Sequence, residues 1–193
     1  MANLDMPRGL WPVANLNGSP YNGGTVKVAF QSSDETATFV GDPVKFDGGG
    51  VTDTTGSGGS YPSVAQAAAS SEMCGVIVAF EPVRTNLELK YRLADTQRFA
   101  YMAPAVQGQL FAVQCSGAFA LTALGNTADI VVGSGNTKTG ISAVELDSSN
   151  IGTTKEGLHI VGVVNRPDNT IGTNCDVIVR IAENQYGADA TGV

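Results

Sequence analysis

The chain is poor in the residues on which most catalytic and metal sites depend. Among 193 residues it has a single histidine, His159, and three cysteines, Cys74, Cys115 and Cys175. The cysteines show no CxxC spacing and lie in apolar runs, so we expect buried free thiols in a reducing compartment rather than a disulfide framework or a zinc site. His159 lies inside the apolar run LHIVGVV, which favours a structural role over that of a catalytic base.

Positive charge is also scarce. Eleven lysines and arginines stand against 18 acidic residues, so the net charge is −7 and the pI is near 4.5. Binding to a nucleic-acid backbone requires clustered Lys and Arg, and we therefore expect no direct nucleic-acid partner. No apolar run approaches the roughly 18 residues of a membrane span, so no membrane partner is expected. The start, MANLDMPRGLWPV, lacks the pattern of a secretory signal, which predicts synthesis in the cytoplasm.

The sequence is rich in glycine, with 24 residues, and in short β-prone runs separated by turn signals. This pattern predicts an all-β fold of roughly nine short strands, either an antiparallel β-barrel or a jelly-roll-like sandwich, with an extended N-terminal arm and long loops. We place the arm at residues 1–24, one β-rich domain at 25–186 and a C-terminal tail at 187–193.

The strongest strand pair is predicted in residues 158–186. In DVIVRI, the residues Val177, Val179 and Ile181 fall on one face, as in a half-buried strand. The nearly all-apolar LHIVGVV suits a strand covered on both faces. The intervening NRPDNTIGTN has the composition of a chain reversal, so we expect a buried hairpin with a long, functional connection.

The remaining segments are interpreted by the same patterns. Strands are expected in 25–31, 74–82, 87–94, 98–103 and 109–115, with Val76, Val78 and Phe80 on one face, and LELKYRLA (87–94) is the cleanest alternation. Residues 37–47 predict two short strands around a bend at Gly41. Residues 48–63 predict an exposed loop, residues 63–73 a short helix because of their alanines, and residues 123–157 two short strands between wide loops.

The arm contains several large apolar residues, and its prolines keep the main chain extended. The apolar residues include Leu10, Trp11, Val13, Leu16 and Tyr21. A solvated tail does not tolerate such residues well, so the arm is expected to lie on a surface. Two alternatives stay open: it packs on its own domain, or it reaches a neighbouring subunit.

Motifs for chemistry are weak. GSGNTKTG at 133–140 has a threonine where a phosphate loop needs glycine before lysine, so we interpret it as a turn. The acid pairs Asp34 with Glu35 and Asp42 with Asp47 are more typical of solvated loops than of a glycosidase or a calcium site. We therefore expect no enzyme activity, no metal and no cofactor.

Seven segments spread over most of the chain resemble the small head proteins of tailed, podovirus-like bacteriophages, the capsid decoration or cement proteins. These segments are PRGLWPVANLNGSPYNG (7–23), GDPVKF (41–46), GVIVAFEP (75–82), LKYRLAD (89–95), VELD (144–147), NRPDNTIGTN (165–174) and VRIAENQY (179–186). The resemblance implies a non-catalytic virion protein, made in the host bacterial cytoplasm. It would bind the outside of the assembled major capsid protein as a dimer or trimer and cement neighbouring subunits. The contact residues expected on this basis are Pro7, Leu10, Trp11, Val13, Leu16, Tyr21, Arg166 and Asp168.

Two other classes of function stay open. A carbohydrate-binding or adhesin-like β-sandwich on the virion surface would need exposed aromatic platforms, and the sole tryptophan, Trp11, lies in the arm. A hydrolase would need acidic residues brought together in a pocket from separate loops.

Overall fold

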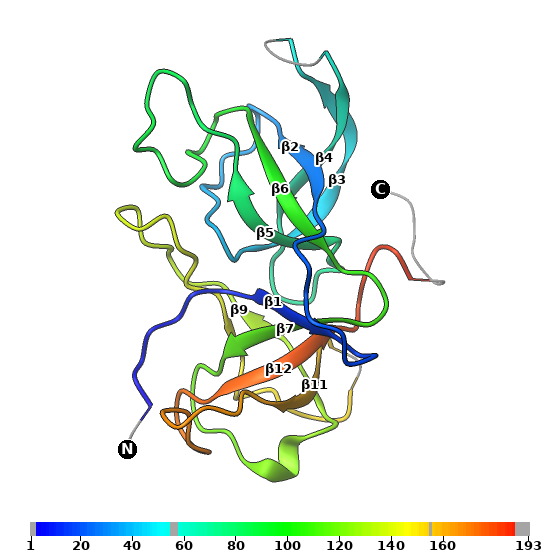
Figure 1. Cartoon of the computed structure of the whole chain (residues 1–193), viewed down its shortest axis with the longest axis vertical. Coiled ribbons are helices and arrows are strands. Elements are labelled where there is room, and N and C mark those ends of the chain that lie inside the picture. The colour runs from blue at the N-terminus through cyan, green and yellow to red at the C-terminus, as the bar shows by residue number, and fades with distance from the viewer. Residues whose placement is uncertain (1–2, 55–57, 155, 188–193) are drawn as a thin grey trace.

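The strands form two β units stacked along the long axis of the molecule (Figure 1). The structure, a computed structural model, describes residues 3–54, 58–154 and 156–187. One unit is a closed barrel, in the upper half of Figure 1, and the other is a five-stranded sheet, in the lower half. The predicted all-β fold is confirmed. Within the described residues, no helix is long and apolar enough to cross a membrane.

The barrel is built from the first half of the chain. Its strands are β2 (Val26–Phe30), β3 (Pro43–Thr52), β4 (Ser60–Gln66), β5 (Gly75–Phe80) and β6 (Arg98–Pro104), closed in the order β2-β4-β3-β5-β6. The β2–β4 contact that closes one side is parallel and the other pairings are antiparallel. The barrel interior is filled by apolar side chains that include Val28, Phe30, Val44 and Ile77.

The second unit is an antiparallel sheet with the order β1-β7-β12-β11-β8. Its strands are β1 (Trp11–Asn15), β7 (Gln109–Gln114), β12 (Asp176–Ile181), β11 (Leu158–Val163) and β8 (Thr127–Ala128). A small ribbon of β9 (Ile130–Val131) and β10 (Glu145–Leu146) and one 3-10 turn, η1 (Leu121–Ala123), complete it. The predicted hairpin of β11 and β12 is confirmed.

The barrel and the sheet share one apolar core. Val76 of β5 and Ala103 of β6 belong to the same buried cluster as Phe111 of β7 and Leu158 of β11. Leu10, just before β1, is also buried there. All three cysteines are buried free thiols, as expected, and Cys115 and Cys175 lie in this shared core.

Two β-bulges change which side chains of β11 and β5 share a face, so the faces predicted for these two strands are partly wrong. In β11 the register shifts between Ile160 and Gly162, and Val161 is exposed, so this strand is covered on one face and not on both. In β5 the shift lies between Ile77 and Ala79. Val76 and Val78 therefore pack on the shared core, whereas Phe80 packs on the barrel core instead of sharing their face.

The predicted loop at 48–63 and the predicted helix at 63–73 are both wrong. Strand β3 continues through its glycines to Thr52, and β4 begins at Ser60 and pairs with it, with Val51 opposite Tyr61. Val64, inside the predicted helix, is fully buried in the barrel. The helix preference of the alanines is a fraction of a kcal/mol per residue, which barrel pairing and burial override.

The predicted strand at 87–94 is wrong as well, and its faces are inverted. Leu87 is 77% exposed, whereas Arg92 is fully buried. The Arg92 guanidinium lies 2.9 Å from an Asp34 carboxylate oxygen. It donates hydrogen bonds to the main-chain carbonyls of Gln31, Asp34, Thr36 and Thr96. Arg98 similarly donates to the carbonyls of Glu81, Leu89 and Tyr91. The two arginines thus supply the donors that a neighbouring strand would otherwise provide.

The arm crosses the bend at Gly41 before it enters the sheet. The Leu10 N–H donates to the Gly41 carbonyl at 2.9 Å. Both Gly9 and Gly41 have positive φ, and a Cβ at either would lie 2.3 Å from a carbonyl oxygen of the other segment. Residues 11–15 then pair with β7, so this part of the arm packs on its own chain. The tail predicted at 187–193 lies, apart from Gly187, outside the described residues.

Asp42, beside this crossing, predicts a measurable pH dependence. Burial raises its pKa to about 6, against hydrogen bonds from Ser142, the Phe39 N–H and Gln66 that act in the other direction. The folded state therefore binds a proton more tightly than the unfolded state, and stability falls as pH rises from the unfolded to the folded pKa. Between about pH 5 and about pH 7 the wild type should lose about 1 kcal/mol more unfolding free energy than Asp42→Asn. Urea titrations at the two pH values measure it; parallel pH profiles would contradict the prediction.

Arg92 predicts a large stability loss. Arg92→Met should lower the free energy of unfolding by about 3–5 kcal/mol, because it removes the buried guanidinium together with its ion pair to Asp34 and its hydrogen bonds to four carbonyls. Arg84→Met, on the same loop but exposed, is the matched control and should change stability by less than about 0.5 kcal/mol. Chemical denaturation measures both. Equal losses of unfolding free energy in the two variants would contradict a stabilising role for the buried hydrogen bonds of Arg92.

Candidate interaction site

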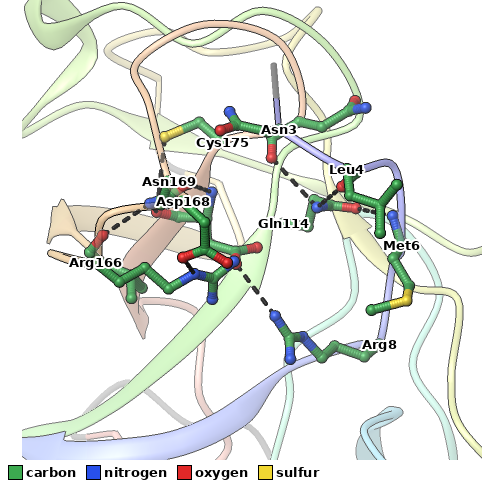
Figure 2. A network of polar contacts seen from close by, with 12 residues as sticks. Asn3, Leu4, Met6, Arg8, Gln114, Arg166, Asp168, Asn169 and Cys175 are labelled. Atoms are coloured by element: carbon green, nitrogen blue, oxygen red, sulfur yellow. Dashed lines mark hydrogen bonds and ion pairs between the residues drawn. The ribbon is translucent and has the colours of Figure 1, made fainter. Parts of the chain in front are cut away.

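The N-terminal residues 3–8, here called the strap, lie across the connection between β11 and β12. Figure 2 shows Asn3, Leu4, Met6 and Arg8 of the strap facing Gln114 and the residues of that connection. The strap is not a strand of the sheet. It is held instead by side chains, at three places along its length.

The first anchor is Asn3. Its side-chain nitrogen donates to the Thr170 carbonyl at 2.7 Å and to the Thr173 carbonyl at 2.8 Å. Its side-chain oxygen accepts from the Thr170 N–H at 2.8 Å. One amide side chain therefore binds the middle of the long connection in the way that a paired strand would.

The second anchor is Gln114, at the end of β7. Its side-chain oxygen accepts from the Met6 N–H at 2.9 Å, and its nitrogen donates to the Leu4 carbonyl at 2.9 Å. Gln114 lies opposite Asp176 in the β7–β12 register, so the two side chains project from the same face of the sheet. Together they provide the sheet's attachment points for the strap.

The third anchor is a cluster of four charges. The Asp176 side chain is 1% exposed, and its Oδ2 lies 2.6 Å from Arg166 Nη2 and 3.3 Å from Arg8 Nη2. Arg166 Nε also donates to Asp168 at 2.8 Å, but the Asp168 side chain is 72% exposed. A buried carboxylate thus fixes two arginines, one from the strap and one from the connection.

The anchored strap turns its apolar side chains outward. Leu4 is 71% exposed and Met6 is 56% exposed, although the main-chain groups of both residues are hydrogen-bonded to Gln114. Asp5 between them lies near Glu145, whose pKa is raised first by burial and then by the charge of Asp5. The strap therefore presents two large apolar groups on a fixed main chain.

The structure places the expected contact residues in three environments. Leu10 is buried in the chain's own core, so its side chain does not face a partner here. Leu16 is exposed at the turn after β1, and Arg166 and Asp168 form the ion pair described above. The half-buried residues are Pro7, Trp11, Val13 and Tyr21.

An apolar groove of about 330 Å³ brings several of these residues together beside the crossing. Trp11, Tyr21 and Ile141 are among its lining residues. The Arg8 guanidinium lies 4.4 Å from the centre of the Trp11 ring and also lines the groove. Arg8 therefore borders both the groove and the charged cluster.

Sequence analysis missed Asn3, Arg8, Gln114 and Asp176. Arg8 lies inside the quoted arm, but its acidic partner is 168 positions away. Asp176 alternates with the apolar residues Val177 and Val179, which predicts the opposite face of the strand, but the structure buries it beneath the strap. The sequence signal that could have indicated this cluster is the arginine in each of two proline-containing segments, PRG and NRP. When such a segment lies on a sheet, the charge of a partly buried arginine has to be compensated by a carboxylate.

The groups considered for catalysis are engaged in structural contacts. Both ring nitrogens of His159 have partners, the Gly125 carbonyl at 3.1 Å and Arg180 Nε at 3.3 Å. Asp34 pairs with Arg92, and Asp42 is buried among donors. Across residues 3–54, 58–154 and 156–187, no group of three or more His, Cys, Asp or Glu could hold a metal ion.

Cations lie over three of the aromatic rings. Arg8 lies over Trp11, and Lys27 Nζ lies 4.6 Å from the ring centres of both Tyr61 and Phe99. Sugar recognition by stacking uses an open ring face. These three rings therefore give little support to the carbohydrate-binding alternative.

The charged cluster predicts unequal effects for its two carboxylates. Asp176→Asn should lower the free energy of unfolding by about 2–3 kcal/mol, because the two partly exposed arginines lose their charge-assisted hydrogen bonds to a buried carboxylate. Asp168→Asn is the matched control and should cost less than about 1 kcal/mol, since its ion pair is exposed. Urea denaturation at neutral pH measures both, and a loss at Asp168 as large as that at Asp176 would contradict the assignment of the anchor.

Comparisons with family models, with curated proteins and with solved structures find no match to this chain. Its function is therefore inferred from its own residues. The observation with the clearest functional meaning is the strap, whose main chain is fixed while Leu4 and Met6 are exposed.

Proposed function

We propose that this protein is a structural, non-catalytic virion protein that binds the outside of the assembled phage capsid and cements neighbouring major capsid subunits, acting as a dimer or trimer. The observation that carries the proposal is the strap. Its apolar side chains are held in the solvent by a main chain that is anchored at Asn3, Gln114 and Arg8.

A rigid exposed apolar strip supports binding to a protein surface. Large apolar groups in solvent are costly unless a partner covers them, and the strap makes Leu4 and Met6 neighbours on one short segment. Because the main chain is already ordered, little further entropy is lost when a partner binds. Leu16, exposed at the turn that follows β1, adds a third apolar group from the same arm.

The chemistry of the remaining residues supports a role without catalysis. Burial raises the pKa of the Cys74 and Cys115 thiols to about 12, so neither forms a nucleophilic thiolate at neutral pH. The single histidine is bound on both ring nitrogens. The net charge of −7 suits the outer face of a shell, away from packaged DNA.

Co-sedimentation tests the proposal. The wild-type protein is mixed with assembled shells of the major capsid protein from the phage that carries the gene, and the bound amount is measured at increasing concentration. We expect saturation at a fixed stoichiometry per shell. A protein that stays in the supernatant at all concentrations would reject the capsid role.

Side-chain variants test the strap without removing it. Truncation of residues 1–24 would also remove β1 and the core residue Leu10, so it cannot separate contact from folding. The double variant Leu4→Ser, Met6→Ser should weaken shell binding by at least about tenfold, because two apolar side chains lose their buried area. Leu93→Ser, also exposed but on the barrel loop, is the matched control. Unchanged binding of the double variant would remove the strap from the contact.

A further inference from the structure

We propose that the pocket between the strap and the β11–β12 connection is a binding site for a carboxylate that carries a short apolar group. The pocket has a volume of about 460 Å³ and is lined by Asn3, Leu4, Met6, Arg8, Gln114, Arg166 and Asp168. The site shares Leu4 and Met6 with the proposed capsid contact, but its test, the binding of a small carboxylate, does not depend on the capsid role.

Both arginines have donors to offer a ligand. The Arg8 side chain is 39% exposed and that of Arg166 is 33% exposed, although Asp176 between them is buried. Arg8 has five N–H donors and makes one ion pair, at the long distance of 3.3 Å. Its Nε is buried and has no hydrogen-bond partner among the described residues, so a ligand would be bound through the other N–H groups of this partly exposed side chain.

Asp168 shows that the pocket accepts a carboxylate on Arg166. Its Oδ1 lies 2.8 Å from Arg166 Nε, yet its side chain is 72% exposed. Exposed ion pairs of this kind are weak, so an external carboxylate can replace Asp168 on the same guanidinium nitrogen. Asp168 is therefore an internal competitor of the ligand.

The charge balance of the four-charge cluster allows one ligand carboxylate in place of Asp168. Arg8 and Arg166 contribute two positive charges, and the buried Asp176 compensates one of them. When Asp168 turns into the solvent, one positive charge remains in the pocket. Because Asp176 holds both arginines in place, the ligand does not have to order them on binding.

The apolar part of the ligand is set by the strap. Leu4 and Met6 line the same pocket and are exposed. A carboxylate attached to an isobutyl-sized group would place its charge on the arginines and cover these side chains. Two sources have this chemistry: a second copy of this chain, whose Leu87 and Glu88 are exposed side by side on a loop, and a different molecule.

The test uses N-acetylleucine as the probe and its neutral amide, N-acetylleucinamide, as the matched control ligand. The arginine Nε–Hε signals of the ¹⁵N-labelled full chain are followed by NMR during titration. We expect the signals of Arg8 and Arg166 to shift with the acid and to stay in place with the amide. Signals that do not move, or that move equally with both probes, would overturn the proposal.

The affinity for the probe in three variants distinguishes a binding site from a purely structural role of these residues. Asp168→Asn removes the internal competitor and should tighten probe binding by about two- to fivefold. Arg166→Gln should weaken it by at least about tenfold. Arg84→Gln, an exposed arginine on the barrel loop, should leave it unchanged. Weaker binding in Asp168→Asn, a variant expected to stay folded, would overturn the proposal even if Arg166→Gln fails to fold.

Sedimentation velocity distinguishes the two sources. Self-association that N-acetylleucine disperses and Glu88→Gln abolishes supports the site with a second copy as its ligand. A monomer that still binds the probe supports the site with a different molecule as its ligand. Self-association that neither the probe nor Glu88→Gln alters, together with no probe binding, would overturn the proposal.

Discussion

The main-chain contact between Gly9 and Gly41 is the constraint on which the placement of the N-terminal residues depends. The Leu10 N–H donates to the Gly41 carbonyl at 2.9 Å, and there is no room for a Cβ on either glycine. The segments before and after this crossing lie on different parts of the molecule. Leu10 enters the core shared by barrel and sheet and β1 follows, while Arg8 and the strap pass outward over the connection between β11 and β12.

In the strap, the main chain is bound by polar side chains, whereas the apolar side chains are exposed to solvent. Polar side chains of Asn3 and Gln114 bind main-chain groups, and the apolar side chains of Leu4 and Met6 are left in solvent. The buried carboxylate of Asp176 secures the end of the segment next to the crossing. Order in the main chain and exposure of apolar groups together make a surface that can bind a partner at low entropic cost.

Sequence patterns predicted the elements whose burial follows a simple alternation and failed where a bulge or a buried polar group intervened. The β11–β12 pair and the strands around Phe99 and Phe111 were predicted correctly. LELKYRLA has equally clean alternation, but the buried side chain is Arg92, because its guanidinium satisfies four loop carbonyls. Of the candidate site, Arg166 and Asp168 were among the expected contact residues, while Asp176, which holds Arg166 in place, was not.

The sequence by itself determined the all-β class, the buried cysteines and the hairpin at 158–186, because these follow from residue type and period 2. Tertiary structure decided that the strands divide between a closed barrel and a sheet, since pairing partners lie far apart in the chain. It also decided the site: Arg8 and Asp176 are 168 positions apart, and the crossing at Gly41 together with the β1–β7 and β7–β12 pairings brings them together. Local patterns record which face of a segment is apolar, but not which distant charge will lie against it.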